Sequence, residues 1–226
     1  MRSAAEAGDV AAQALYAQML SEGRGVALDL VEALHWYALA ANSGDAIAMN
    51  MLGRCHELGR GTPRNHSLAA VWYRKAAMRG LDWGMYNYAN LLRRGMGVKS
   101  DRAHALVLYR RAADLGHAKS MNLIGRYHDE GWGIPRDAVA AAKWYQKSAE
   151  GGDFRGQTSH ASILAQSGHL DAAVAWLRRA AQTATPAFLE RLGADLMQSP
   201  HEPLRQVGQT LCGEIEGFPH RSAPVA

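Results

Sequence analysis

The sequence is poor in cysteine, phenylalanine and long runs of one residue class. Its 226 residues include two cysteines, three phenylalanines and seven prolines. Because Cys55 and Cys212 are the whole cysteine complement, a disulfide framework is excluded, and the fold must depend on packing. No signal peptide or apolar segment of transmembrane length is visible. If Met1 is the native start, this predicts a cytoplasmic protein; for a truncated chain the location is unknown.

Charge is also unremarkable in amount and distribution. The chain has 25 basic and 21 acidic residues, a formal net charge of +4 and a pI of about 9.2. No polybasic run accompanies this mild basicity, so a nucleic-acid partner is not expected. With 48% hydrophobic residues, the composition is that of an ordinary folded protein.

What the sequence does contain is a unit that recurs every 36 residues. Each copy opens with a glycine, continues through a Gly-x-Gly pair and closes with an aromatic pair before the next glycine. The opening glycines are Gly8, Gly44, Gly80, Gly116 and Gly152. The aromatic positions are Trp36-Tyr37, Trp72-Tyr73, Leu108-Tyr109 and Trp144-Tyr145. Self-similarity at such a period indicates a solenoid.

One copy, residues 44–79, shows what the unit must fold into. Residues 46–58 lack proline and repeat bulky side chains at helical spacing, which predicts a first helix. Two glycines and a proline in residues 59–63 then end that helix. Asn65 is a suitable N-cap for a second helix over about 65–79, and Asp29, Asp101 and Asp137 are its equivalents. Neither helix buries its apolar stripe alone, so the pairs must stack.

The recurrent aromatic residues are interpreted as packing residues, because helical recurrence is a packing signal. We expect Trp36, Trp72 and Trp144 to lie in the core. Truncation of a fully buried tryptophan would cost about 3–5 kcal/mol.

The pattern Ala-x3-Leu-Gly, Gly-x-Gly, Asp, Ala, Trp-Tyr-x2-Ala-Ala, Gly resembles the Sel-one-like repeat (SLR) family, a relative of the tetratricopeptide repeat. The match covers residues 1 to about 181. The resemblance implies an all-α fold, a right-handed α/α superhelical solenoid that scaffolds protein complexes without catalysis. Gly84 and Ser120 depart from the family's alanine, and His56 and His128 stand where the family commonly has tyrosine.

The resulting domain prediction has three parts. Residues 1–185 form the solenoid, with repeats at 8–43, 44–79, 80–115, 116–151 and a fifth, shortened repeat at 152–183. Residues 186–216 form two capping helices, and residues 217–226 form a disordered tail.

Motifs for chemistry are missing. No His-Glu-x-x-His, Cys-x-x-Cys, phosphate loop or nucleophile elbow occurs, and the Gly-x-Gly pairs follow helices instead of strands. His56 and His128 lie two repeats apart, too far to share a zinc ion. The sequence therefore predicts no catalytic residue, no metal and no cofactor.

Candidate binding residues are those that stacking does not require. If the resemblance to tetratricopeptide packing holds, the first helices line a concave groove, with their polar positions pointing into it. Asparagine is a poor helix former, yet several asparagines lie in mid-helix near an arginine, where they could bind a peptide backbone and its carboxylate. The predicted groove residues are Asn50, Arg54, Trp83, Tyr86, Asn90, Arg93, Lys119, Asn122, Arg126 and Arg155. Trp83 and Trp132 are candidate apolar anchors.

Three functions are compared on this basis. The preferred one is a non-catalytic scaffold or adaptor that holds a protein or peptide, with an acidic or carboxylate-bearing segment, in the concave groove. A narrower alternative is a bacterial immunity or regulatory protein that masks its partner. Another alternative is a metal-handling or enzymatic accessory that uses the histidines. A long shallow groove favours the first two, and a deep pocket with convergent titratable groups favours the last.

Overall fold

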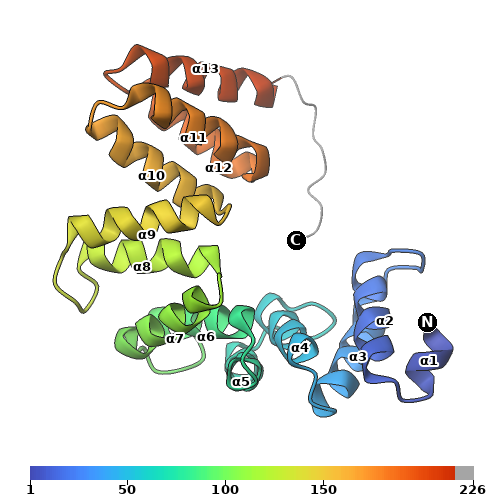
Figure 1. The fold of residues 1–226 in the computed structure, drawn as a ribbon. Helices are drawn as coiled ribbons and strands as arrows, with labels where there is room; N and C mark the ends of the chain where they lie inside the picture. The colour runs from blue at the N-terminus through green and yellow to red at the C-terminus, as the bar shows by residue number, and fades with distance from the viewer. Residues whose placement is uncertain (217–226) are drawn as a thin grey trace. The chain divides into compact units, whose positions relative to one another are not determined.

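The computed structural model describes residues 1–216, which form thirteen α-helices and no strand (Figure 1). The chain begins with a short helix, α1 (Arg2–Glu6), and the other helices follow as pairs. The pairs are α2 (Val10–Glu22) and α3 (Leu30–Asn42), α4 (Ala46–Leu58) and α5 (His66–Met78), α6 (Asp82–Arg94) and α7 (Arg102–Asp114), α8 (Ala118–Glu130) and α9 (Ala138–Glu150), α10 (Phe154–Gln166) and α11 (Leu170–Thr183), and α12 (Pro186–Met197) and α13 (Glu202–Glu216). The predicted all-α fold of helix-pair repeats is confirmed.

The helices fall into two compact units. Unit 1 is Met1–Leu115, and unit 2 starts at Gly116, the opening glycine of the fourth repeat. Every first helix packs along its own second helix. Within each unit that second helix packs on the next first helix, except that α11 packs on α13. The predicted disordered tail, residues 217–226, lies outside the described residues. No helix within residues 1–216 is long and apolar enough to cross a lipid bilayer.

Side chains that cap the helices set the boundaries of the repeat. The Asp29 carboxylate accepts hydrogen bonds from the backbone amides of Val31 and Glu32, and the Asn65 amide oxygen accepts one from Leu68. Asp101 and Asp137 cap α7 and α9 in the same way, as predicted. These bonds satisfy amides that the first turn of a helix leaves without partners.

A buried tyrosine of the second helix packs against the first helix in each of the first four repeats. The second-helix tyrosines Tyr37, Tyr73, Tyr109 and Tyr145 are all buried. In α4 the Tyr73 ring lies directly on Gly53, where an added Cβ atom would stand 2.7 Å from the ring. Gly125 receives the Tyr145 ring in the same manner, at 2.6 Å. In these two repeats the glycine of the first helix therefore leaves the space, or seat, that the tyrosine ring occupies.

The buried tyrosine hydroxyls need polar partners, and the ends of the first helices supply them. The Tyr73 hydroxyl donates to the Glu57 carboxylate at 2.6 Å, and the Tyr145 hydroxyl donates to Asp129 at 3.2 Å. Tyr109 uses a different position of its first helix and donates to the Asn90 amide oxygen at 2.8 Å. Each bond ties a second helix to the first helix of the same repeat.

The tryptophans lie at different depths. Trp36 is in the core, at 8% exposure, whereas Trp72, which packs against the core, and Trp144 are partly buried. The reason is that alanines and the tyrosine fill the interior and leave the larger indoles at its edge. There the ammonium groups of Lys75 and Lys147, one helical turn further on, lie 4.1 Å and 4.7 Å from the respective ring centroids.

The last helices of unit 2 share one apolar core. Leu204, Val207 and Leu211 of α13 pack with Leu192 of α12 and Leu177 of α11. The Phe154 and Phe188 rings join the start of α10 to α12 edge to face, with centroids 4.8 Å apart. The residues 186–216 predicted to cap the solenoid thus form a helical hairpin docked on the fifth repeat.

The seat under Tyr73 predicts a stability change. Gly53→Ala should lower the free energy of unfolding by about 1–3 kcal/mol, because its methyl group overlaps the ring. The matched control is Gly213→Ala in α13, where an added Cβ meets nothing within 4 Å and alanine should stabilise by about 0.5–1 kcal/mol. Urea unfolding followed by circular dichroism measures both. Equal effects of the two substitutions would contradict the packing argument.

The two thiols predict different reactivities. Both cysteines are free, as expected, and Cys55 is buried while Cys212 is half-buried. Burial raises the pKa of the Cys55 thiol to about 11, which suppresses its thiolate. With a thiol-reactive chromogenic reagent at neutral pH, Cys212 should react first and Cys55 should react only in denaturant. Rapid reaction of Cys55 in the Cys212→Ser variant would refute this.

The tyrosine bonds predict a loss of stability at alkaline pH. Burial and then the neighbouring carboxylates raise the pKa values of Tyr73 and Tyr145. Because an unfolded phenol ionises near about pH 10, their contribution is complete below that pH and is lost as the pH rises beyond it. Denaturant midpoints between about pH 9 and pH 11.5 should therefore fall less steeply for Tyr73→Phe than for the parent chain. If the midpoints of the parent chain and of Tyr73→Phe fell in parallel with pH, ionisation of Tyr73 would not be the cause of the alkaline loss of stability.

Candidate functional site

The first helices of unit 1, α2, α4 and α6, carry the surface on which binding residues were predicted. Ile47 on α4 and Trp83 on α6 occupy equivalent positions of consecutive repeats, three residues after the opening glycine. Both are exposed, Ile47 to 61% and Trp83 to 42%. The Trp83 ring meets the Tyr86 ring edge to face, with centroids 6.0 Å apart. An isoleucine and an aromatic pair are thus presented on one face, which we call the unit 1 face.

Asn50 does not belong to the open part of that face. Its side chain is 6% exposed, and its amide oxygen accepts a hydrogen bond at 2.8 Å from the Asn87 amide of the next repeat. The expectation that this asparagine offers a free amide to a ligand is therefore wrong. The two amides bond each other because α4 and α6 lie side by side at this level. Asn87 was not among the predicted residues, although it follows Tyr86 directly.

Asn90 is likewise engaged within its own repeat. Its amide oxygen holds the Tyr109 hydroxyl, so the acceptor predicted to bind a peptide backbone has an internal partner. Glu57 of α4 has the same structural role toward Tyr73. Asn90 was interpreted as a groove residue because sequence spacing does not reveal that a buried hydroxyl lies next to its amide.

Arg54 is the cation of the unit 1 face that remains available. It is half-buried, and its guanidinium forms no hydrogen bond or ion pair with any side chain of residues 1–213. With Arg60 it lines a narrow crevice over Cys55 and Tyr37. An unpaired guanidinium suits a carboxylate, which it can bind through two parallel hydrogen bonds. Arg93, on α6, is half-buried at the far end of its helix.

Unit 2 presents a different first-helix face, on α8 and α10. The Arg126 guanidinium forms an ion pair with Glu130 at 2.7 Å and lies 4.7 Å from the centroid of the Trp132 ring. Trp132 in turn meets the Tyr127 ring edge to face at 5.4 Å. Arg126 and Trp132 are therefore partners of each other, and their role in binding a ligand stays a prediction. The pairing of Arg126 with Glu130, four residues on, is visible in the sequence.

The other predicted residues of unit 2 are divided between interior and surface. Asn122 is 4% exposed, so it too is interior, and its amide oxygen has no hydrogen-bond partner among the described residues. Lys119 is half-buried, and Arg155 is exposed, with its guanidinium over the Phe154 and Phe188 rings at 4.4 Å and 5.8 Å. Asn50 and Asn122, at equivalent mid-helix positions of the two units, are thus both buried, whereas Asn90 is half-buried.

The histidines form no constellation for metal binding. In the part of the chain that the structure describes, no three or more His, Cys, Asp or Glu side chains gather closely enough to hold an ion. Burial lowers the pKa of His56 and of His160, and the His160 ring meets Trp176 edge to face at 5.5 Å. These contacts are those of half-buried packing residues.

Comparison with known proteins agrees with this architecture. A Sel1 repeat protein from Oxalobacter formigenes has 27% sequence identity and a TM-score of 0.81, over 93% of this chain and 89% of that one. A protective antigen with an SLR fold from uropathogenic Escherichia coli has 28% identity and a TM-score of 0.73, over 96% of this chain and 47% of that one. This chain therefore spans about half the length of the antigen.

A more distant likeness concerns the fold alone. An immunity protein from Pseudomonas aeruginosa shares 16% identity with a TM-score of 0.60, over 92% of this chain and 82% of that one. A search of curated proteins gave no match.

The family model for the Sel1 repeat matches five segments. They are residues 10–45, 46–81, 84–117, 118–153 and 170–182. The first four matches each cover one helix pair, and the fifth covers the second helix of the shortened repeat. Sel1 repeats generally mediate protein–protein interactions and are generally non-catalytic. With the helix pairs, the 36-residue register and these matches in agreement, the chain belongs to the Sel1 repeat family.

Proposed function

We propose that this chain is a non-catalytic interaction module that holds a segment of a partner protein on the unit 1 face. The observation that carries the proposal is the exposure of Ile47 and Trp83 at equivalent positions of α4 and α6. Exposed large apolar side chains that recur on one face mark interaction surfaces, and tryptophan is enriched among residues that dominate binding energy.

The partner segment that fits this face has mixed chemistry. Its apolar side chains lie against Ile47, Trp83 and Tyr86, and its carboxylate pairs with Arg54. This keeps the acidic partner expected from the sequence but assigns its recognition to Arg54 instead of Asn50 and Arg126. On unit 2, Lys119 and Arg155 extend the basic character of the first helices.

Masking of a partner is a narrower form of the same proposal. An immunity role has support in the fold shared with the Pseudomonas aeruginosa immunity protein, at 16% identity. The unit 1 face serves an adaptor or a masking protein equally, since both require a bound segment.

Substitution on this face should separate binding from stability. Trp83→Ala should weaken binding of the partner by more than about tenfold, and Arg54→Ala by about tenfold to a hundredfold, with unfolding midpoints near that of the parent chain. The partner is first identified by affinity capture from the native host, then purified and titrated by calorimetry.

The matched control is Val107→Ala, an exposed apolar residue on the second helix α7 of the same unit. It should leave both capture and affinity unchanged. Retention of every native partner by the Trp83→Ala, Arg54→Ala double variant would overturn the proposal.

A further inference from the structure

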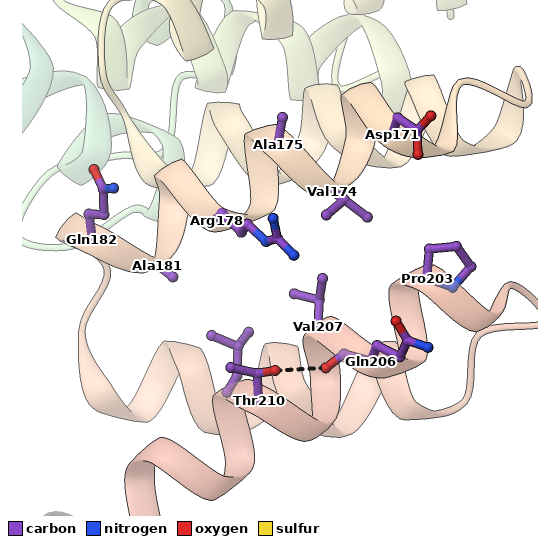
Figure 2. Close-up of a pocket in the computed structure, with 11 residues that line it drawn as sticks. Asp171, Val174, Ala175, Arg178, Ala181, Gln182, Pro203, Gln206, Val207 and Thr210 are labelled. Atoms are coloured by element: carbon purple, nitrogen blue, oxygen red, sulfur yellow. Dashed lines mark hydrogen bonds between the residues drawn. The ribbon is translucent and has the colours of Figure 1, made fainter.

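A second site lies between α11 and α13 of unit 2, each of which is the second helix of its pair. These helices border a cleft of about 750 Å³, shown in Figure 2. Val174 and Ala181 line it from α11, and Val207 and Leu211 line it from α13. A volume of this size is within the range of clefts that hold small ligands or peptide side chains.

The cleft exists because a loop that covers the second helices in unit 1 has no counterpart here. In that unit the Gly-x-Gly loop of one repeat packs on the first turn of the preceding second helix. At Gly61 an added Cβ would lie 2.1 Å from the Leu30 carbonyl oxygen, and at Gly97 it would lie 2.2 Å from the His66 carbonyl carbon. After α12 the connection is only residues 198–201, against residues 59–65 after α4. The beginning of α11 is therefore left uncovered beside Pro203 and Val207.

Charge on α11 defines what the cleft can accept. Arg178 extends into the space between the two helices, toward Val207 (Figure 2). Its guanidinium has no hydrogen-bond or ion-pair partner among the side chains of residues 1–213, although Arg179 beside it lies over the Trp176 ring at 4.6 Å. Asp171, at the end of the cleft where α11 begins, also has no side-chain partner there. The cleft therefore presents a positive charge among apolar side chains and a negative charge further along α11. A complementary ligand carries a negative charge to face Arg178 and a positive charge to face Asp171.

The spacing of the two charges selects an extended peptide. Asp171 and Arg178 are seven residues apart on a helix that rises about 1.5 Å per residue, which places their backbones about 10 Å apart. An extended chain covers this distance in three residues, at about 3.3 Å each. We propose that the α11–α13 cleft binds an extended peptide segment in which an acidic residue, three positions from a basic residue and separated from it by apolar side chains, pairs with Arg178.

This site is independent of the unit 1 face, and its test uses a defined probe. The probe is a fluorescein-labelled, amidated peptide with the core Lys-Val-Leu-Glu, titrated with the full chain by fluorescence anisotropy. The parent protein should bind it saturably. Arg178→Gln should weaken binding by about tenfold or more, since a charge-assisted contact is lost, whereas Arg179→Gln and Trp83→Ala should leave it unchanged.

Charge reversal makes the test specific. Arg178→Glu should lose the Lys-Val-Leu-Glu probe and prefer a Lys-Val-Leu-Lys probe, with circular dichroism confirming that both variants fold like the parent. Three results would each overturn the proposal: no saturable binding of the probe at millimolar protein, equal loss with Arg178→Gln and Arg179→Gln, or saturable binding of decanoate in place of the peptide with the same dependence on Arg178.

Discussion

The contact between a second-helix tyrosine and a small residue of the first helix is the constraint on which the repeats depend. Tyr73 needs Gly53 beneath its ring and Glu57 at its hydroxyl, and Tyr145 needs Gly125 and Asp129. A buried phenol without an acceptor would lose a hydrogen bond that water otherwise supplies. Both demands fall on the same first helix, nine and thirteen residues after the opening glycine. They therefore fix the register of the two helices within each repeat.

First-helix positions that do not contact the tyrosine are free to carry binding residues, and their side chains differ between the two units. In unit 1 they are apolar and aromatic, with Ile47 and Trp83 exposed and Arg54 unpaired. In unit 2 the corresponding arginine is neutralised by Glu130 and covered by an indole. The cleft between α11 and α13 adds a surface of a third kind, with an arginine among apolar walls. The chain thus carries three chemically distinct surfaces.

Sequence periodicity predicted the elements well, because glycine and cap positions act locally. The ends of α4 and the Asn65 cap follow from side chains a few residues away. Contacts between helices of different repeats were harder to predict. Asn50 was interpreted as a ligand-binding residue because its hydrogen-bond partner, Asn87, comes from the next repeat. Trp72 was placed in the core because periodicity identifies the inward side of a helix but not the depth at which a side chain stops. The cleft beside Arg178 was missed because it arises where the repeat pattern ends.

The equal length of the first four repeats has a consequence for how such a chain changes over evolution. Because Gly53 and Tyr73 belong to one 36-residue copy, duplication or loss of a whole copy brings the ring and its seat together and leaves both intact. Ile47 and Trp83 lie outside that contact, so each can be exchanged without altering the closure of its helix pair. Substitutions that change the binding partner can therefore accumulate in one repeat at a time without weakening the packing that folds it.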